Sequence, residues 1–138
     1  MEGKDEDIVV CKYINDLYQK PESLSDAINT KGAEFNAYID PDERYIIFTG
    51  YKRKSNIGSG DLFISKKSDK GDWLPALPIA NGINSKGITY SPYISPDGKI
   101  LFFSSNRTIP ALLSKNQNLS QLKEIANSPG NGNDDIYW

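Results

Sequence analysis

The sequence predicts an all-β fold, and three observations lead to that prediction. Aromatic residues make up 11% of the 138 residues, with eight Tyr and five Phe among them. Eleven Gly and eight Pro punctuate the chain at short intervals, as expected of a protein with many turns. The third observation is an internal repeat: residues 28–32 read Ile-Asn-Thr-Lys-Gly, and residues 83–87 read Ile-Asn-Ser-Lys-Gly.

The repeat continues along the chain in one register, at an offset of 55 residues. Tyr-Ile-Asp-Pro-Asp at 38–42 aligns with Tyr-Ile-Ser-Pro-Asp at 93–97, and Ile-Ile-Phe-Thr at 46–49 aligns with Leu-Phe-Phe-Ser at 101–104. A second marker is an Asp followed by three apolar residues. It occurs three times, beginning at Asp7, Asp61 and Asp135.

Each copy of the repeat reads as four short strands. Pro41 and Pro96 stand at the second position of four-residue turns, where a fixed φ is favourable. The fourth strand carries Pro21 in one copy, and Pro75 and Pro78 in the next; since proline cannot donate to a ladder, we expect this strand at the outer edge. In chain order the expected strands are 8–13, 18–24, 36–39, 44–49, one beginning at Asp61, 73–79, 91–94, 99–105 and 135–138.

The second strand of each copy is apolar on both faces, as Tyr45–Phe48 and Ile100–Phe103 show. Such a strand is typical of a sheet that lies between two other layers. Four antiparallel strands with both faces covered describe a β-propeller blade. A β-sandwich is the alternative, but it predicts alternating strands and no repeat.

We therefore expect residues 1–138 to form one β-propeller segment of about two four-stranded blades plus partial strands. The repeat units cover about 28–82 and 83–138, with an inserted loop or short helix at 108–134. Within the insertion, Asn118 is the expected N-cap of a helix reaching Asn127, with Gln121 at the third position. Propellers close with roughly four to eight blades. The expectation is therefore a fragment of a six-bladed propeller, a subunit that self-associates, or an open array.

A family resemblance supports this fold. Residues 91–107 read Ser-Pro-Tyr-Ile-Ser-Pro-Asp-Gly-Lys-Ile-Leu-Phe-Phe-Ser-Ser-Asn-Arg, and 135–137 read Asp-Ile-Tyr. This pattern resembles the TolB-type (WD40-like) β-propeller repeat family. In the first copy Asp40–Glu43 replaces the Ser-Pro-Asp-Gly turn, and Gly-Tyr-Lys at 50–52 replaces Ser-Asn-Arg. The resemblance implies a six-bladed propeller in an exported bacterial protein, periplasmic or extracellular, that binds other proteins and has no general catalytic motif. No signal peptide is visible in this chain.

Composition narrows the chemistry. The chain has no His and a single Cys, Cys11, so a Ser-His-Asp or Cys-His mechanism cannot be assembled from it, and an ordinary zinc site is not expected. The net charge of −2 and the placing of the aromatics inside apolar strands argue against nucleic acid. No apolar stretch approaches the roughly 20 residues of a membrane span. We predict no cofactor, no metal and no catalytic residue.

Strand alternation predicts which loops share a face. The loops before the first strands and after the second strands emerge on one side, and they carry the basic residues. The opposite side receives the Asp-rich turns. A basic rim can hold an anionic ligand or an acidic patch of a protein. The candidate ligand-binding residues are Lys31, Lys52, Arg53, Lys86 and Arg107.

The sequence thus predicts a non-catalytic module that binds or scaffolds a protein or glycan, with self-association or missing blades covering the open faces. One alternative is a sialidase-like glycoside hydrolase whose site is completed by blades outside this chain. It is suggested by an Asp-box-like turn at 68–73, which lacks the Ser or Thr before Trp73. Another is a Ca²⁺ site at Asn131, Asn133, Asp134 and Asp135, which lacks the EF-hand order.

Overall fold

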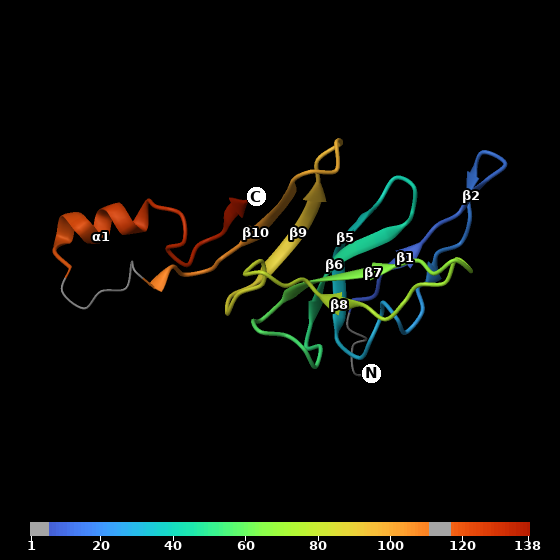
Figure 1. The fold of residues 1–138 in the computed structure, drawn as a ribbon, viewed down its shortest axis with the longest axis horizontal. Coiled ribbons are helices and arrows are strands. Elements are labelled where there is room, and N and C mark those ends of the chain that lie inside the picture. Colours follow the sequence, from blue (N-terminus) through green and yellow to red (C-terminus); the bar gives the residue numbers. More distant parts are fainter. Residues whose placement is uncertain (1–5, 111–116) are drawn as a thin grey trace.

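The computed structural model describes residues 6–110 and 117–138, and within these ranges the protein is mostly β. The all-β prediction is confirmed: the sheets are antiparallel, a single short helix is present among the described residues, and none of the sheets they form closes on itself. The molecule is elongated, with the helix α1 at one end and the N-terminal hairpin that contains β2 at the other (Figure 1).

The first repeat forms a four-stranded sheet in the order β5-β6-β7-β8. Strand β5 begins three residues earlier than the sequence predicted and β6 ends two residues later, because their ladder continues through the pairs Ala33–Tyr51, Glu34–Gly50 and Phe35–Thr49. The fourth is shorter, with only Leu77–Pro78 paired and an isolated bridge between Lys67 and Trp73. The strands are β5 (Ala33–Ile39), β6 (Tyr45–Tyr51), β7 (Asp61–Lys66) and β8 (Leu77–Pro78).

Both faces of this first sheet are covered, as the apolar run in β6 predicted. Ile46 and Phe48 pack on one face with Ile28 and Phe63, against the N-terminal segment. Ile47 points to the other face, where it packs with Leu62 and with Phe103 of the second sheet. Neighbouring residues of a strand point to opposite faces, so one strand contributes to two apolar clusters.

The second repeat forms a three-stranded sheet in the order β11-β10-β9, from β9 (Thr89–Ile94), β10 (Leu101–Ser105) and β11 (Asp135–Tyr137). Strand β9 lies against β5, β6 and β7 of the first sheet, so the two sheets stack (Figure 1). The outer strand β11 is open: Ile136 is 68% exposed, and Trp138, which follows the strand, is 82% exposed.

Each repeat carries the same irregularity in its first strand. The pairing of β5 with β6 shifts register between Phe35 and Tyr38, and Asn36 there has φ 48°. The pairing of β9 with β10 shifts at the corresponding place, and Ser91 there has φ 49°. Asn36 and Ser91 are 55 residues apart, so the two sheets have a bulge at the same repeat position.

The repeated Ile-Asn motif also makes the same contacts twice. Asn84 bridges two strands of the first sheet: its amide accepts from Leu62 N at 2.8 Å and donates to the carbonyls of Leu62 and Ile79, each at 3.0 Å. Asn29 does the same one repeat earlier, accepting from Ile8 N at 3.0 Å and donating to the Ile8 carbonyl at 2.9 Å. Both Asn side chains are buried, and each provides the acceptor for a backbone N–H, that of Leu62 or Ile8, while the carbonyls of these two residues also accept from Ile79 N and Leu24 N.

The N-terminal strands differ from the expectation. Instead of continuous strands at 8–13 and 18–24, the chain forms two pairs of two-residue strands, so those two boundaries were wrong. The cause is a local hairpin: Asn15 and Asp16 both have positive φ, 51° and 60°, which closes a tight turn between β2 and β3. The pairs are β1 (Val9–Val10) with β4 (Glu22–Ser23), and β2 (Tyr13–Ile14) with β3 (Leu17–Tyr18).

The predicted helix is present as α1 (Leu119–Ala126), and its capping agrees with the prediction. The Asn118 side chain accepts from Gln121 N, and the Gln121 side chain accepts from Asn118 N, both at 3.0 Å. Its apolar side packs poorly, with Leu119 70% exposed. Part of the predicted insertion, residues 111–116, lies outside the described residues.

Candidate functional site

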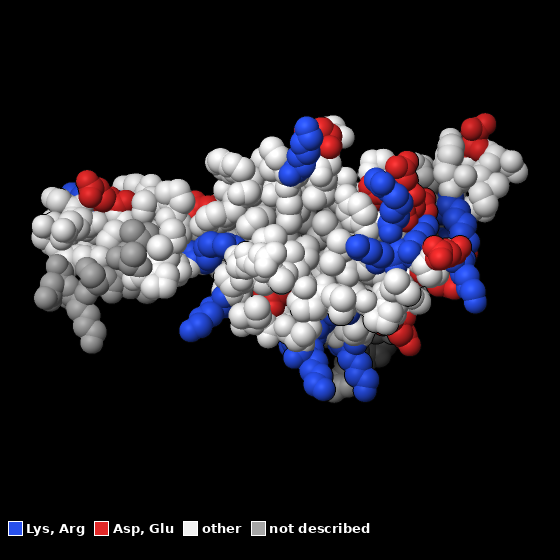
Figure 2. Space-filling view, viewed as in Figure 1, with Lys and Arg blue, Asp and Glu red and all other residues white. Residues whose placement is uncertain are grey.

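The structure brings three of the five candidate residues together. Lys31 and Lys52 lie on loops at the start of β5 and the end of β6, and with Arg53 they line a hollow of about 340 Å³. Basic side chains project along the lower edge of the molecule in Figure 2, over these loops. The full lining of this hollow, here called the basic hollow, is Thr30, Lys31, Gly32, Lys52, Arg53, Lys54, Ser55 and Ala76.

A glycine allows the two loops to approach. A Cβ atom at Gly32 would lie 1.9 Å from the carbonyl oxygen of Tyr51, closer than any real contact. The glycine of the repeated Lys-Gly pair therefore has a steric role in the first copy. Gly32 brings Lys31 alongside Lys52, which is why two residues 21 positions apart share one hollow.

Arg53 is held inside the fold. Its guanidinium donates to the Ile28 carbonyl at 2.6 Å and to Glu34 Oε1 at 2.8 Å, and Glu34 is fully buried. It also lies over the rings of Phe63 and Phe48, at 4.6 and 5.3 Å from their centroids. Glu34 neutralises the charge of Arg53, so the basic character of the hollow comes from its exposed lysines.

Arg107 repeats this arrangement in the second sheet. It lies 4.6 Å from the centroid of Tyr137 and 5.1 Å from that of Phe103, and it donates to the carbonyls of Gly82 and Ile83. Its counterpart in the first copy is Arg53, and not Lys52, with which the sequence alignment pairs it. The first copy has one extra residue, and Lys52 takes it up with φ 57°.

Lys86 is exposed and lies on the equivalent loop of the second copy, outside the basic hollow. That loop packs tightly against the loop after β6, because a Cβ at Gly58 would lie 1.9 Å from the Gly87 carbonyl oxygen. The five predicted residues are therefore distributed over three settings: Lys31 and Lys52 in the hollow, Arg53 and Arg107 against aromatic rings, and Lys86 on its own loop.

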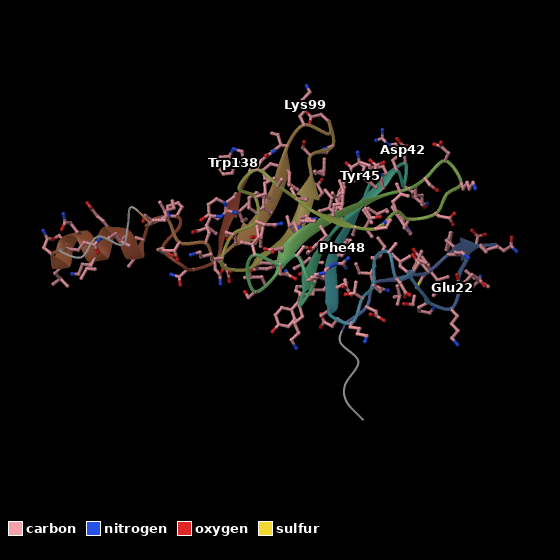
Figure 3. All side chains as sticks on the ribbon, turned by 60° about the horizontal axis from the view of Figure 1, so that its bottom comes forward. Glu22, Asp42, Tyr45, Phe48, Lys99 and Trp138 are labelled. Carbon is pink, nitrogen blue, oxygen red and sulfur yellow. The ribbon has the colours of Figure 1, made fainter. Side chains whose placement is uncertain are left out.

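Sequence reasoning did not identify a second and larger hollow, of about 630 Å³, between the β5–β6 turn and the β9–β10 turn. We call it the inter-repeat groove. In Figure 3, Tyr45 lies between Asp42 on one turn and Lys99 on the other. The groove is lined by Tyr38, Asp40, Pro41, Asp42, Arg44, Tyr45, Lys66, Ile94, Ser95, Pro96, Asp97 and Gly98.

One ion pair fixes the wall of the inter-repeat groove. Arg44 donates from Nε and Nη2 to the two carboxylate oxygens of Asp40, at 2.7 and 3.0 Å. These hydrogen bonds lower the pKa of Asp40 and outweigh the opposite effect of its burial. Burial, with smaller effects from Tyr38 and Asp40, raises the pKa of Tyr45. At neutral pH the wall therefore holds a carboxylate, a guanidinium and the neutral phenol of Tyr45 side by side.

The polar residues 131–135 have local partners. Asn131 Oδ1 accepts from Asn133 N at 2.7 Å, and Asp135 Oδ2 accepts from Gly130 N at 2.9 Å. No cluster of three or more His, Cys, Asp or Glu suited to a metal occurs in residues 6–110 and 117–138. None of the helices in the same ranges is long and apolar enough to cross a membrane.

Comparisons of the chain with protein-family models, curated proteins and solved structures gave no match. The basic hollow and the inter-repeat groove are therefore the two features of the chain that bear on function.

Proposed function

We propose that the chain is a β-propeller segment of about two blades that acts as a non-catalytic binding or scaffolding module for a protein or glycan. Two features support the blade interpretation. Equivalent segments of the repeat form stacked antiparallel sheets, and each sheet holds an arginine against two aromatic rings. The exported location implied by the family resemblance stays a prediction.

The basic hollow is the proposed binding site for an anionic group of the ligand. The observation that carries this proposal is that Lys31, Lys52 and Lys54 line one hollow, are exposed, and form no ion pair with any acidic residue in the described part of the chain. Three neighbouring ammonium groups raise the local positive potential, which favours a carboxylate, sulfate or phosphate group.

The hydrolase alternative gains no support from the arginines that a sialidase-like site needs. The chain has three arginines, Arg44, Arg53 and Arg107. Two of them are packed against aromatic rings in separate sheets, and Arg44 pairs with Asp40 on the opposite turns. They do not converge on one hollow.

The test is a matched charge reversal with two labelled probes, a hexaglutamate peptide and a heparin hexasaccharide. We expect Lys31→Glu/Lys52→Glu to weaken binding of one of these probes about tenfold, since each exposed contact contributes about 0.5–1 kcal/mol. In this double variant, Kd for the probe should also change less with salt concentration. Lys86→Glu is the control, because it makes the same kind of charge change outside the hollow and should alter Kd less than about twofold.

Fluorescence anisotropy of each probe gives Kd for the native chain and the variants. If the native chain binds neither probe, the anionic-ligand proposal is wrong. Equal weakening by Lys86→Glu would show that the charge of the whole rim, and not the hollow, attracts the probe.

A further inference from the structure

The inter-repeat groove differs from the basic hollow in its chemistry. Half-buried Tyr38 and Tyr45 form part of its lining, and their ring centroids are 6.4 Å apart. The ring centroids of Tyr38 and Tyr93 are 5.9 Å apart, with the ring planes at 85° in an edge-to-face arrangement. Aromatic rings of different orientation thus gather where the two turns face each other.

Donors and acceptors surround these rings. Asp42 and Asp97 are exposed on the two turns, and Lys66 is exposed at the end of β7. Arg44 donates from Nε and Nη2 to Asp40, and Nη2 also lies 3.6 Å from Asp42 Oδ2. Its side chain is 69% exposed, so the N–H groups of Nη1 remain available at the groove. The ion pair with Asp40 fixes the plane of the guanidinium.

The charges of the lining nearly cancel. Asp40, Asp42 and Asp97 stand against Arg44 and Lys66, which leaves a single excess negative charge. An anionic ligand is disfavoured by that excess, and a strongly cationic one meets two positive groups. A neutral ligand with many hydroxyl groups can instead accept from Arg44 and Lys66 while it donates to the carboxylates.

We propose that the inter-repeat groove binds a neutral saccharide. The C–H groups of a sugar ring pack on the negative faces of tyrosine rings, and its hydroxyls bond to the polar groups around them. The volume of about 630 Å³ lies within the roughly 300–1,000 Å³ range of small-ligand sites. The proposal is independent of the basic hollow, which lies on the opposite loops.

The experiment is isothermal titration of the full chain with cellotetraose, chitotetraose, maltotetraose and mannotetraose. At least one should bind, with an affinity that changes little between low and high salt, because the ligand is uncharged. For that saccharide, Tyr38→Leu should weaken binding about tenfold, because the ring face is lost while apolar volume remains. Asp42→Asn should weaken binding severalfold through the loss of a charged acceptor.

Glu43→Gln is the matched control. Glu43 is in the same turn but pairs with Lys67 and does not line the groove, so Kd should stay within about twofold of the native value. Lys31→Glu/Lys52→Glu should also leave saccharide binding unchanged, which separates this proposal from the anionic site. The lack of binding to all four saccharides would overturn it, as would salt-sensitive binding of a hexalysine peptide that blocks the groove. Because far-UV circular dichroism reports folding, a folded Tyr38→Leu that retains full affinity would also overturn it.

Discussion

In each sheet an arginine packs against two aromatic rings at equivalent repeat positions. The charge of the arginine is compensated differently in the two sheets. In the first sheet the side chain of Arg53 is 9% exposed and faces Glu34, which is fully buried. In the second, Thr89 occupies the place of Glu34, and Arg107 is half-buried and bonds to backbone carbonyls and Ser105 Oγ.

The difference follows from how each sheet is covered. The first sheet has neighbours on both faces, so only 9% of the Arg53 side chain is exposed, and a charge that is largely buried needs an opposite charge beside it. The second sheet is covered on one side by the first sheet, and its outer strand is open to water. Solvent can then compensate much of the charge of Arg107. Burial thus determines whether this repeat position requires an acidic partner.

The largest effect should come from removing the acidic partner in the first sheet. We expect Glu34→Gln to lower the free energy of unfolding by about 3–5 kcal/mol, because it leaves the buried Arg53 without a counter-charge. Thr89→Val, the change at the equivalent position, should cost about 1 kcal/mol. Urea unfolding monitored by circular dichroism measures both. Equal losses would mean that the two arginines are equally solvated.

A double variant sharpens this first test. Glu34→Gln/Arg53→Met removes both charges and fills the volume between the rings, so it should be more stable than Glu34→Gln alone. If it is less stable, the stacking of Arg53 on Phe48 and Phe63 matters more than its charge.

The second prediction compares the two buried asparagines. Asn84→Ala should cost about 2–3 kcal/mol, because Leu62 N and the Ile79 carbonyl lose this partner, whereas the Leu62 carbonyl keeps its bond from Ile79 N. Asn29→Ala should cost about 1 kcal/mol, since its partner Ile8 lies in a partly exposed segment where water can replace the amide. Urea unfolding gives the ranking, and amide exchange at Ile8 and Leu62 locates the loss. A larger loss of stability for Asn29→Ala than for Asn84→Ala would contradict the interpretation that water can replace the Asn29 amide in the N-terminal segment.

The sequence was sufficient for the local features. The turns at Pro41 and Pro96, the apolar second strands and the cap of α1 depend on neighbouring residues, and the structure has them. The sequence alignment pairs Arg107 with Lys52, whereas the structure pairs it with Arg53. The first copy has a single extra residue, which Lys52 accommodates in a left-handed backbone conformation, and nothing in the composition marks that position.

The inter-repeat groove could not be predicted because it depends on distance in space. Its two walls come from turns 55 residues apart, and only the stacking of the sheets brings them together. A usable signal was present: a Tyr at the same repeat position before each turn, Tyr38 and Tyr93. Without the stacking of the sheets, however, the pattern marks these residues as strand positions alone.

The smallest expected effect concerns the carboxylates of the two equivalent turns. Hydrogen bonds from Arg44 lower the pKa of Asp40, and a hydrogen bond from Ser95 lowers the pKa of Asp97. A carboxyl group with a lowered folded-state pKa contributes stability above its unfolded value, near 3.9, and loses it as the pH falls through the folded value. Both turns should therefore lose stability below about pH 4. The turn with Asp40 should lose more, because the hydrogen-bond partner of Asp40 is a cation.

Urea unfolding at pH 7 and at pH 3 tests this comparison. Asp40→Asn should lower stability at pH 7 and reduce the further loss on acidification, because the titrating group is gone. Asp97→Asn should do the same to a smaller extent, since Asp97 is exposed and bonds to a neutral hydroxyl. Added salt should narrow the gap between the variants by screening the Asp40–Arg44 pair. If the native chain and Asp40→Asn lose the same stability between the two pH values, Asp40 does not titrate in this window, and the ion pair on the wall of the groove contributes nothing to folding.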